Sequence, residues 1–152
     1  MIRLSRYPRR LAALFGAAFL FGVGCSQAGS GPTLTAPEAL DKARAGEITL
    51  IDIRTPMEWR QTGVAPVAHR IDMQDPQGPS GFASKVLAEV GGDKSAPIAL
   101  ICRTGNRSGY MQQELQRLGF TNVYDVSEGM AGGKAGPGWI RRALPVESCT
   151  SC

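Results

Sequence analysis

Two short apolar runs constrain the fold of this chain more than any other feature. Residues 48–53 are rich in β-branched side chains, and residues 97–102 read Pro-Ile-Ala-Leu-Ile-Cys. Neither run shows the strict apolar–polar alternation of a strand with one wet face. Strands of this kind belong to sheets that are covered on both faces, which are mostly parallel. The chain is therefore expected to build its core around such a sheet.

Helical patterns alternate with these strands. Thr35 is a predicted N-cap, with Glu38 three residues later, for a helix that ends near Ala45. Further helices are predicted from residue 55 and over 82–90, 108–118 and 139–144, further strands over 69–73 and 122–126, a loop over 75–81 and an irregular segment over 127–138. This order predicts one α/β domain: a central parallel sheet of about five strands with helices on both faces.

The N-terminal segment has the pattern of a secretory signal. Residues 1–10 contain four arginines and no acid, residues 11–23 are uncharged, and small residues follow. We expect a signal over residues 1–28 and export to the bacterial periplasm. Cleavage after Ala28 is one route; the other resembles lipoprotein processing, which ends the signal at residue 24 and lipidates Cys25. An uncleaved anchor is a third alternative, although a spanning helix needs about 20 apolar residues.

The net charge belongs to this signal. The chain has 17 Lys and Arg against 13 Asp and Glu, and loss of the four signal arginines leaves 13 against 13. The remainder therefore lacks the basic character of a nucleic-acid-binding protein, and membrane contact is expected only through a lipid or uncleaved signal. After the signal we expect a linker over 29–33, a domain over 34–146 and a C-terminal tail over 147–152.

The cysteines divide into a pair and an odd thiol. Cys149 and Cys152 form a C-x-x-C that is expected to oxidise to a disulfide outside the cytosol. The alternatives are a resolving pair that relays sulfur and half of a metal site. With one histidine and no second cysteine pair, the chain has too few soft ligands, so no metal or cofactor is expected. Cys102 remains as the odd thiol.

Cys102 lies where an apolar strand ends and a helix is about to begin. Ligands bind at this edge of an open parallel sheet. Gly105 permits a tight curve whose backbone N–H groups, with the helix N-terminus, would stabilise a thiolate. Arg103 and Arg107 add anion-recognising groups, and Ser108 is expected to cap the helix, with its hydroxyl also near a bound sulfur. The alternative is an inert core thiol beside solvated arginines.

The loop Ile101-Cys102-Arg103-Thr104-Gly105-Asn106-Arg107-Ser108 resembles the active-site loop of the rhodanese family of sulfurtransferases. Residues 50–59 resemble the family's first motif, residues 118–124 its helix-to-strand exit, and 128–130 with 139 and 144–145 its closing segment. The resemblance covers about residues 34–146 and identifies the domain as rhodanese-like.

The resemblance implies a ping-pong reaction. The Cys102 thiolate would take a sulfane sulfur from thiosulfate or a persulfide donor and pass it to cyanide or a thiol. Loop amides from Arg103 to Ser108 (Arg103, Thr104, Gly105, Asn106, Arg107, Ser108) would hold the persulfide, and Arg103 or Arg107 the donor's anionic end. Asp52 and Arg54 would shape the site from the neighbouring strand, or form a structural ion pair.

The sequence departs from this family at two places. Gly63-Val64-Ala65 stands where the family has Gly-His-Ile, and residues 132–138 read as a short glycine-rich insertion. Phosphatases and arsenate reductases on the same fold are rivals, but they have one residue more between cysteine and arginine than the four that separate Cys102 from Arg107. A redox or sulfur-relay protein that uses Cys102 with the tail pair is the other rival, followed by a non-catalytic binding module.

Overall fold

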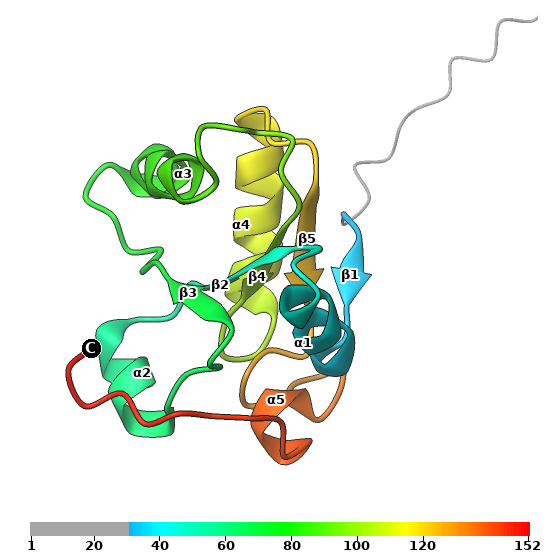
Figure 1. Cartoon of the computed structure of the whole chain (residues 1–152). Coiled ribbons are helices and arrows are strands. Elements are labelled where there is room, and N and C mark those ends of the chain that lie inside the picture. The colour runs from blue at the N-terminus through cyan, green and yellow to red at the C-terminus, as the bar shows by residue number, and fades with distance from the viewer. Residues whose placement is uncertain (1–30) are drawn as a thin grey trace, which may run out of the picture.

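The computed structural model describes residues 31–152, in which helices flank one central sheet (Figure 1). Its five strands are β1 Thr33–Leu34, β2 Thr49–Asp52, β3 Ala68–Arg70, β4 Ile98–Ile101 and β5 Val123–Val126. All neighbours are parallel, in the order β1-β5-β4-β2-β3. The predicted parallel sheet of about five strands is confirmed.

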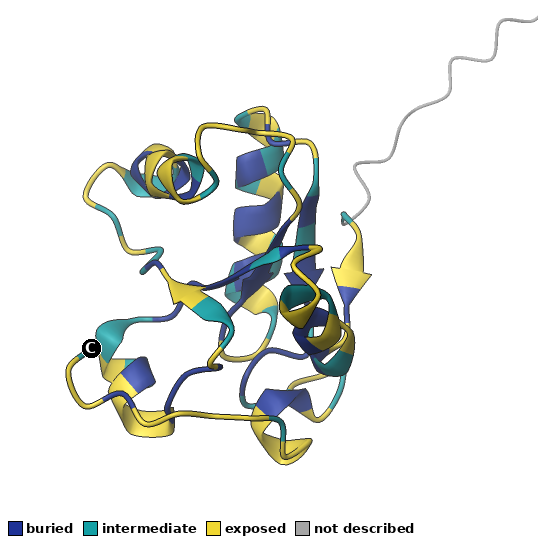
Figure 2. Cartoon of the chain, in the orientation of Figure 1, coloured by how far each residue is buried: buried dark blue, intermediate teal, exposed yellow. Residues whose placement is uncertain are grey.

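The described residues form five helices, α1 Ala36–Arg44, α2 Pro56–Thr62, α3 Gly78–Glu89, α4 Asn106–Arg117 and α5 Gly138–Arg141. Helices pack on both faces of the sheet, as predicted, whereas α2 packs against the C-terminal segment. Alternate residues of β4 face opposite layers, because successive side chains of a strand point to opposite faces. Leu100 and Cys102 pack with residues of α3 and α4, whereas Ala99 and Ile101 pack with residues of α1 and α5. The strands are accordingly mostly buried between yellow outer helix faces (Figure 2).

Local capping chemistry starts two of the helices. Thr35 and Glu38 form a capping box at α1, where the Thr35 backbone N–H donates to Glu38 Oε2 at 2.8 Å. Thr55 and Glu58 repeat the arrangement at α2. Reciprocal bonds of this kind satisfy backbone donors that the first helical turn leaves free. The helix starts predicted at these two places are confirmed.

Three predicted boundaries were wrong. The helix predicted from Phe82 begins at Gly78, inside the predicted loop 75–81, because Pro79 fits a first helical turn. The ladder of β3 ends at Arg70, although backbone bonds to the β2 segment continue as far as Met73. The last helix stops at Arg141, and Ala143 turns into the left-handed region with a φ of 53°.

Both ends of the described chain belong to the folded domain. Thr33, predicted as linker, pairs with Asp125 in β1 because this edge of β5 is otherwise open. At the other end Glu147 bridges Val64 in antiparallel fashion, and Cys149 is buried against Trp59. In Figure 1 this red segment runs past α5 to α2. The predicted linker and tail therefore each lose part of their length to the domain.

The predicted signal and Cys25 lie outside the described residues. Within 31–152, no helix combines the length and the apolar character needed to cross a membrane.

Candidate active site

Cys102 occupies the carboxyl edge of the sheet, directly after β4. It is fully buried, with an exposed fraction of 0%, and is the free cysteine of the described chain. Its Sγ accepts hydrogen bonds from the Gly105 backbone N–H at 3.2 Å and from the Ser108 hydroxyl at 3.3 Å. Two hydrogen-bond donors therefore point at one sulfur atom.

Gly105 makes the curve of the loop. It is the N-cap of α4 with a φ of 90°, a left-handed conformation that glycine adopts without a Cβ penalty. A Cβ at this position would also lie 2.0 Å from the Ser127 carbonyl oxygen. Both facts require glycine here, as the sequence predicted for a tight turn.

Ser108 is not the helix cap that the sequence predicted. The helix starts two residues earlier, because Gly105 takes the cap position, and Ser108 falls in the first turn. Its buried hydroxyl lies 3.1 Å from the Gly105 carbonyl oxygen and 3.3 Å from Cys102 Sγ. The side chain thus serves the cysteine loop rather than the free end of the helix.

The segment after β5 holds the loop by its backbone. Met130 N–H donates to the Cys102 carbonyl at 2.8 Å, and Ala131 N–H donates to the Arg103 carbonyl at 2.8 Å. A Cβ on Gly129 would meet the Arg103 backbone at 2.6 Å. The sequence predicted only an irregular segment here. The backbone hydrogen bonds that order it go to a loop far away in the sequence, which a local pattern does not show.

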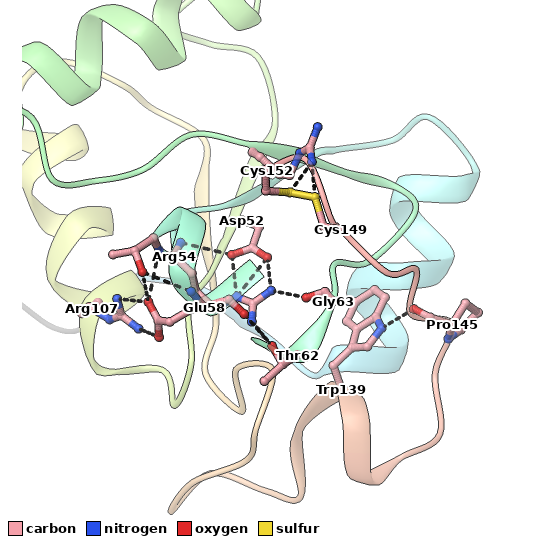
Figure 3. Close-up of polar contacts among 12 residues, drawn as sticks. Asp52, Arg54, Glu58, Thr62, Gly63, Arg107, Trp139, Pro145, Cys149 and Cys152 are labelled. Atoms are coloured by element: carbon pink, nitrogen blue, oxygen red, sulfur yellow. Dashed lines mark hydrogen bonds and ion pairs between the residues drawn. A yellow bond between two sulfur atoms is a disulfide. The ribbon is translucent and has the colours of Figure 1, made fainter. Parts of the chain in front are cut away.

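Arg107 is paired with Glu58 of α2. Two hydrogen bonds of 2.8 and 2.5 Å join the guanidinium to the carboxylate (Figure 3). Bonding to Arg107 lowers the pKa of Glu58 to about 2 and raises the pKa of Arg107. Sequence reasoning missed this role of Glu58, because the contact depends on how two helices far apart in the sequence are placed.

Asp52 and Arg54 form a buried ion pair of 2.6 Å, with exposed fractions of 0% and 1%. Arg54 also donates to Thr62 Oγ1 at 2.6 Å and to the Gly63 carbonyl at 2.7 Å, at the end of α2 (Figure 3). The structural ion pair weighed from sequence is therefore present. It fastens α2, which carries the Glu58 partner of Arg107.

Two cavities flank the cysteine loop. Thr104, Gly105 and Asn106 line an open cavity of about 500 Å³ together with Asp125, Ser127 and residues 133–135. Arg103 lines a smaller cavity of about 70 Å³ on the side of Glu58 and Arg54. Arg103 is exposed, and its guanidinium makes no hydrogen bond or ion pair with any residue of 31–152. Of the two predicted anion-binding arginines, only Arg103 therefore keeps an uncommitted charge.

Asp125 is a buried acid beside this loop that the sequence did not indicate. It lies on β5 with an exposed fraction of 6%, and its Oδ1 has no hydrogen-bond partner. Burial raises the pKa of its carboxyl. A short strand pattern cannot show such an environment, since it depends on which helix covers the strand.

Metal-ligating side chains do not gather at this site. Within residues 31–152, no three or more His, Cys, Asp and Glu side chains are placed to hold an ion. The arrangement instead offers a buried sulfur with two hydrogen-bond donors and one nearby free cation.

A family model and individual protein sequences both match this chain. The model of the rhodanese-like domain family matches residues 35–135. An uncharacterized protein of Rickettsia conorii is 30% identical over 98 residues, which cover 63% of this chain and 80% of that protein. A relative in Rickettsia prowazekii, also uncharacterized, is 28% identical over a stretch of the same length.

Solved structures share the fold. A polysulfide-sulfur transferase homodimer from Wolinella succinogenes has a TM-score of 0.59 at 24% identity, covering 80% of this chain and 82% of that one. A Rhodopseudomonas palustris protein, described as a possible tyrosine phosphatase, has a TM-score of 0.55 at 25% identity, covering 76% and 84%. A rhodanese-related protein from Thermoplasma volcanium has a TM-score of 0.53 at 24% identity and is covered completely, over 78% of this chain.

Proposed function

This chain belongs to the rhodanese-like domain family, and we propose that it is a sulfurtransferase that carries a sulfane sulfur on Cys102. One observation carries the proposal: the Gly105 N–H and the Ser108 hydroxyl both point at the Cys102 sulfur. These two donors would stabilise negative charge that develops on the sulfur during transfer. The sulfur-transferring activity named for the Wolinella succinogenes structure supports this reading of the shared fold.

The proposed reaction has two displacement steps. The Cys102 thiolate attacks the outer sulfur of thiosulfate, the S–S bond of the donor breaks, and sulfite leaves with the bonding electron pair. A thiolate or cyanide acceptor then attacks the outer sulfur of the persulfide and displaces the Cys102 thiolate. Splitting the transfer this way is nucleophilic catalysis: the first step forms the covalent persulfide, and the second step releases the Cys102 thiolate for the next cycle.

Arg103 is the arginine that suits the anionic end of the donor. Two N–H groups of Arg107 bond to Glu58, so this arginine would have to break a two-bond ion pair to bind a sulfonate with them. Arg103 is exposed beside the cavity on the Glu58 side of the loop and has no ion-pair partner among residues 31–152. We therefore assign donor binding to Arg103 and loop anchoring to Arg107.

A phosphatase on the same fold is the rival class, and the same contacts argue against it. Phosphate recognition would need an arginine that turns toward the bound oxyanion, with donors spread around three oxygens. In this loop four residues separate Cys102 from Arg107, and the guanidinium of Arg107 faces Glu58. A bound sulfur atom, which needs two donors directed at one atom, fits this site better than a phosphate group does.

Intact-mass measurement tests the proposal directly. After incubation with thiosulfate, the wild type should gain one sulfur, about 32 Da, as a persulfide. Cys102→Ser should gain none, and a Cys149→Ser/Cys152→Ser double variant should still gain one. Uptake that survives Cys102→Ser, or aryl phosphate hydrolysis without any sulfur uptake, would contradict the assignment.

We propose further that the protein works outside the cytosol, in the periplasm. The Cys149–Cys152 disulfide supports this, since disulfides persist mainly in oxidising compartments. Expression in a bacterial host followed by fractionation gives the test. A mature chain that begins at residue 29, or at a lipidated Cys25 in the membrane fraction, is expected; recovery only as the complete chain in the cytosol would refute export.

A further inference from the structure

We propose that the Cys149–Cys152 disulfide is a second, redox-active site of this protein, which exchanges electrons with an external dithiol and uses Arg70 to hold the displaced thiolate. This site is separate from Cys102, and its chemistry does not depend on the proposed sulfur transfer.

Arg70 contacts both sulfurs of the pair. It is the last residue of β3, and its Nη1 lies 2.6 Å from Cys149 Sγ and 2.6 Å from Cys152 Sγ. A disulfide carries no charge and needs no cation. A guanidinium at both sulfurs gains its full interaction only after the S–S bond opens and one sulfur becomes a thiolate. The contact therefore favours the reduced pair over the oxidised pair.

The two sulfurs are not equivalent. Cys149 is buried, 8% exposed, in a small cluster with Trp59 and Val64, whereas Cys152 lies at its edge and is only partly buried. An incoming thiolate therefore meets Cys152 first. The sulfur that it displaces is the buried Cys149, which would be left beside Arg70 as an anion.

The segment leaves room for such a partner. Two open cavities, of about 280 and 330 Å³, border Cys149 on either side of the segment. Arg70 lines the first and Arg60 the second, together with short polar side chains of the segment. Cys152 lines neither cavity, so an external dithiol reaches it from the exposed surface of the segment, and the cavities leave space beside the displaced Cys149 thiolate.

Anchors on both sides of the pair keep the sulfurs at Arg70. Glu147 is bridged to Val64 by two backbone hydrogen bonds of 2.9 Å. Arg60 donates to the Cys152 carbonyl oxygen. Because the backbone is held independently of the S–S bond, opening that bond need not release the segment.

The exchange balances in two steps. One thiolate of the external dithiol attacks Cys152 Sγ, the S–S bond breaks, and Cys149 leaves as a thiolate at Arg70. The second thiol of the external molecule loses its proton and attacks the mixed disulfide, so the external molecule leaves oxidised. Cys152 leaves as a thiolate and takes up the proton that the second external thiol releases, whereas the proton of the first external thiol stays in solvent while Cys149 remains a thiolate at Arg70. The tail gains two electrons and the external dithiol loses two.

The test measures reduction of the folded full chain by dithiothreitol at pH 7, with peptide mass mapping of residues 143–152 after alkylation. We expect reduction without denaturant. Arg70→Gln should slow it about fivefold or more, because the leaving thiolate loses its cation. Arg70→Lys should restore most of the rate. Arg44→Gln is the control: this exposed arginine of α1 lines neither cavity and makes no contact with the disulfide segment, so its loss should leave the rate unchanged.

Single-cysteine variants test the asymmetry. Cys149→Ser should leave a Cys152 thiol that an aromatic disulfide reagent traps about tenfold faster than it traps Cys149 in Cys152→Ser, since exposure governs access to a thiol. Equal rates for wild type and Arg70→Gln, reduction only after unfolding, or faster trapping of Cys149 would each overturn the proposal. Sulfur uptake by Cys102, measured on the same samples, would report separately on the proposed function.

Discussion

The guanidinium of Arg107 and the carboxylate of Glu58 hold each other across 49 residues of sequence by two hydrogen bonds of 2.8 and 2.5 Å. The contact joins the first turn of α4, which carries the cysteine loop, to the first turn of α2. It gives the loop a fixed neighbour and removes Arg107 from the set of free cations.

Glu58→Gln should make the free energy of unfolding less sensitive to low pH. In the folded state the pKa of Glu58 falls from 4.5 to about 2, chiefly through Arg107. A lowered pKa adds stability above the unfolded value of 4.5, and this contribution is lost as pH falls toward 2. We expect the wild type to exceed Glu58→Gln by about 2 kcal/mol at pH 7, given partial solvent screening, and the gap to close near pH 2.5.

Urea unfolding at several pH values measures that gap. Glutamine keeps the reach of a capping box, so the variant isolates the charge. Glu114→Gln is the control, because its partner Arg117 is largely exposed and such pairs contribute little. A gap that stays constant from pH 7 to pH 2.5 would show that Arg107 does not stabilise the Glu58 anion.

Arg103→Gln should weaken donor binding without disturbing the fold. Arg103 is exposed and free of ion pairs within residues 31–152, so its loss should raise KM for thiosulfate about fivefold or more and leave the unfolding midpoint unchanged. Arg107→Gln should leave KM unchanged but lower the unfolding midpoint, because the contact with Glu58 is lost. Steady-state kinetics and thermal unfolding of both variants test which arginine binds the donor. An unchanged KM in Arg103→Gln would exclude Arg103 from donor binding.

Gly105→Ala should damage the site far more than a similar change elsewhere. Its φ of 90° and a Cβ 2.0 Å from the Ser127 carbonyl oxygen both oppose a side chain. We expect a loss of stability above about 2 kcal/mol together with loss of sulfur uptake. Gly91→Ala has a φ of 65° and open space around its Cβ, so it should cost about 1 kcal/mol and leave uptake intact. Similar losses in the two variants would argue against a tightly packed loop.

Asp125→Asn should stabilise the protein at neutral pH. Burial raises the pKa of Asp125 above its unfolded value of 3.8. Stability from a raised acid pKa is present below 3.8 and is lost as pH rises through the folded pKa. The unfolding free energies of variant and wild type should therefore diverge as pH rises from 3 to 7, with the variant becoming the more stable of the two. A difference that does not change with pH would show that Asp125 is not a strained anion.

The sequence by itself determined the parts of this protein that short-range rules encode. The apolar runs around Leu50 and Leu100 predicted buried parallel strands, and Thr35 and Thr55 marked helix starts through bonds three residues away. The glycine needed at position 105 and the place of Cys102 at a strand end follow from the same local chemistry. Of the strands in residues 31–152, β1 is the one that the sequence did not predict, because a strand of two residues has no periodicity to detect.

Tertiary structure alone decided what each side chain near the cysteine faces. Glu58 could be recognised as a capping residue, but its bond to Arg107 depends on how α2 and α4 sit above the sheet. The same holds for the buried oxygen of Asp125 and for Arg70 beneath the tail disulfide. These contacts join residues far apart in the chain, and their geometry depends on the register and packing of whole elements. A local pattern carries no record of that packing, since it describes only which residues are neighbours along the backbone.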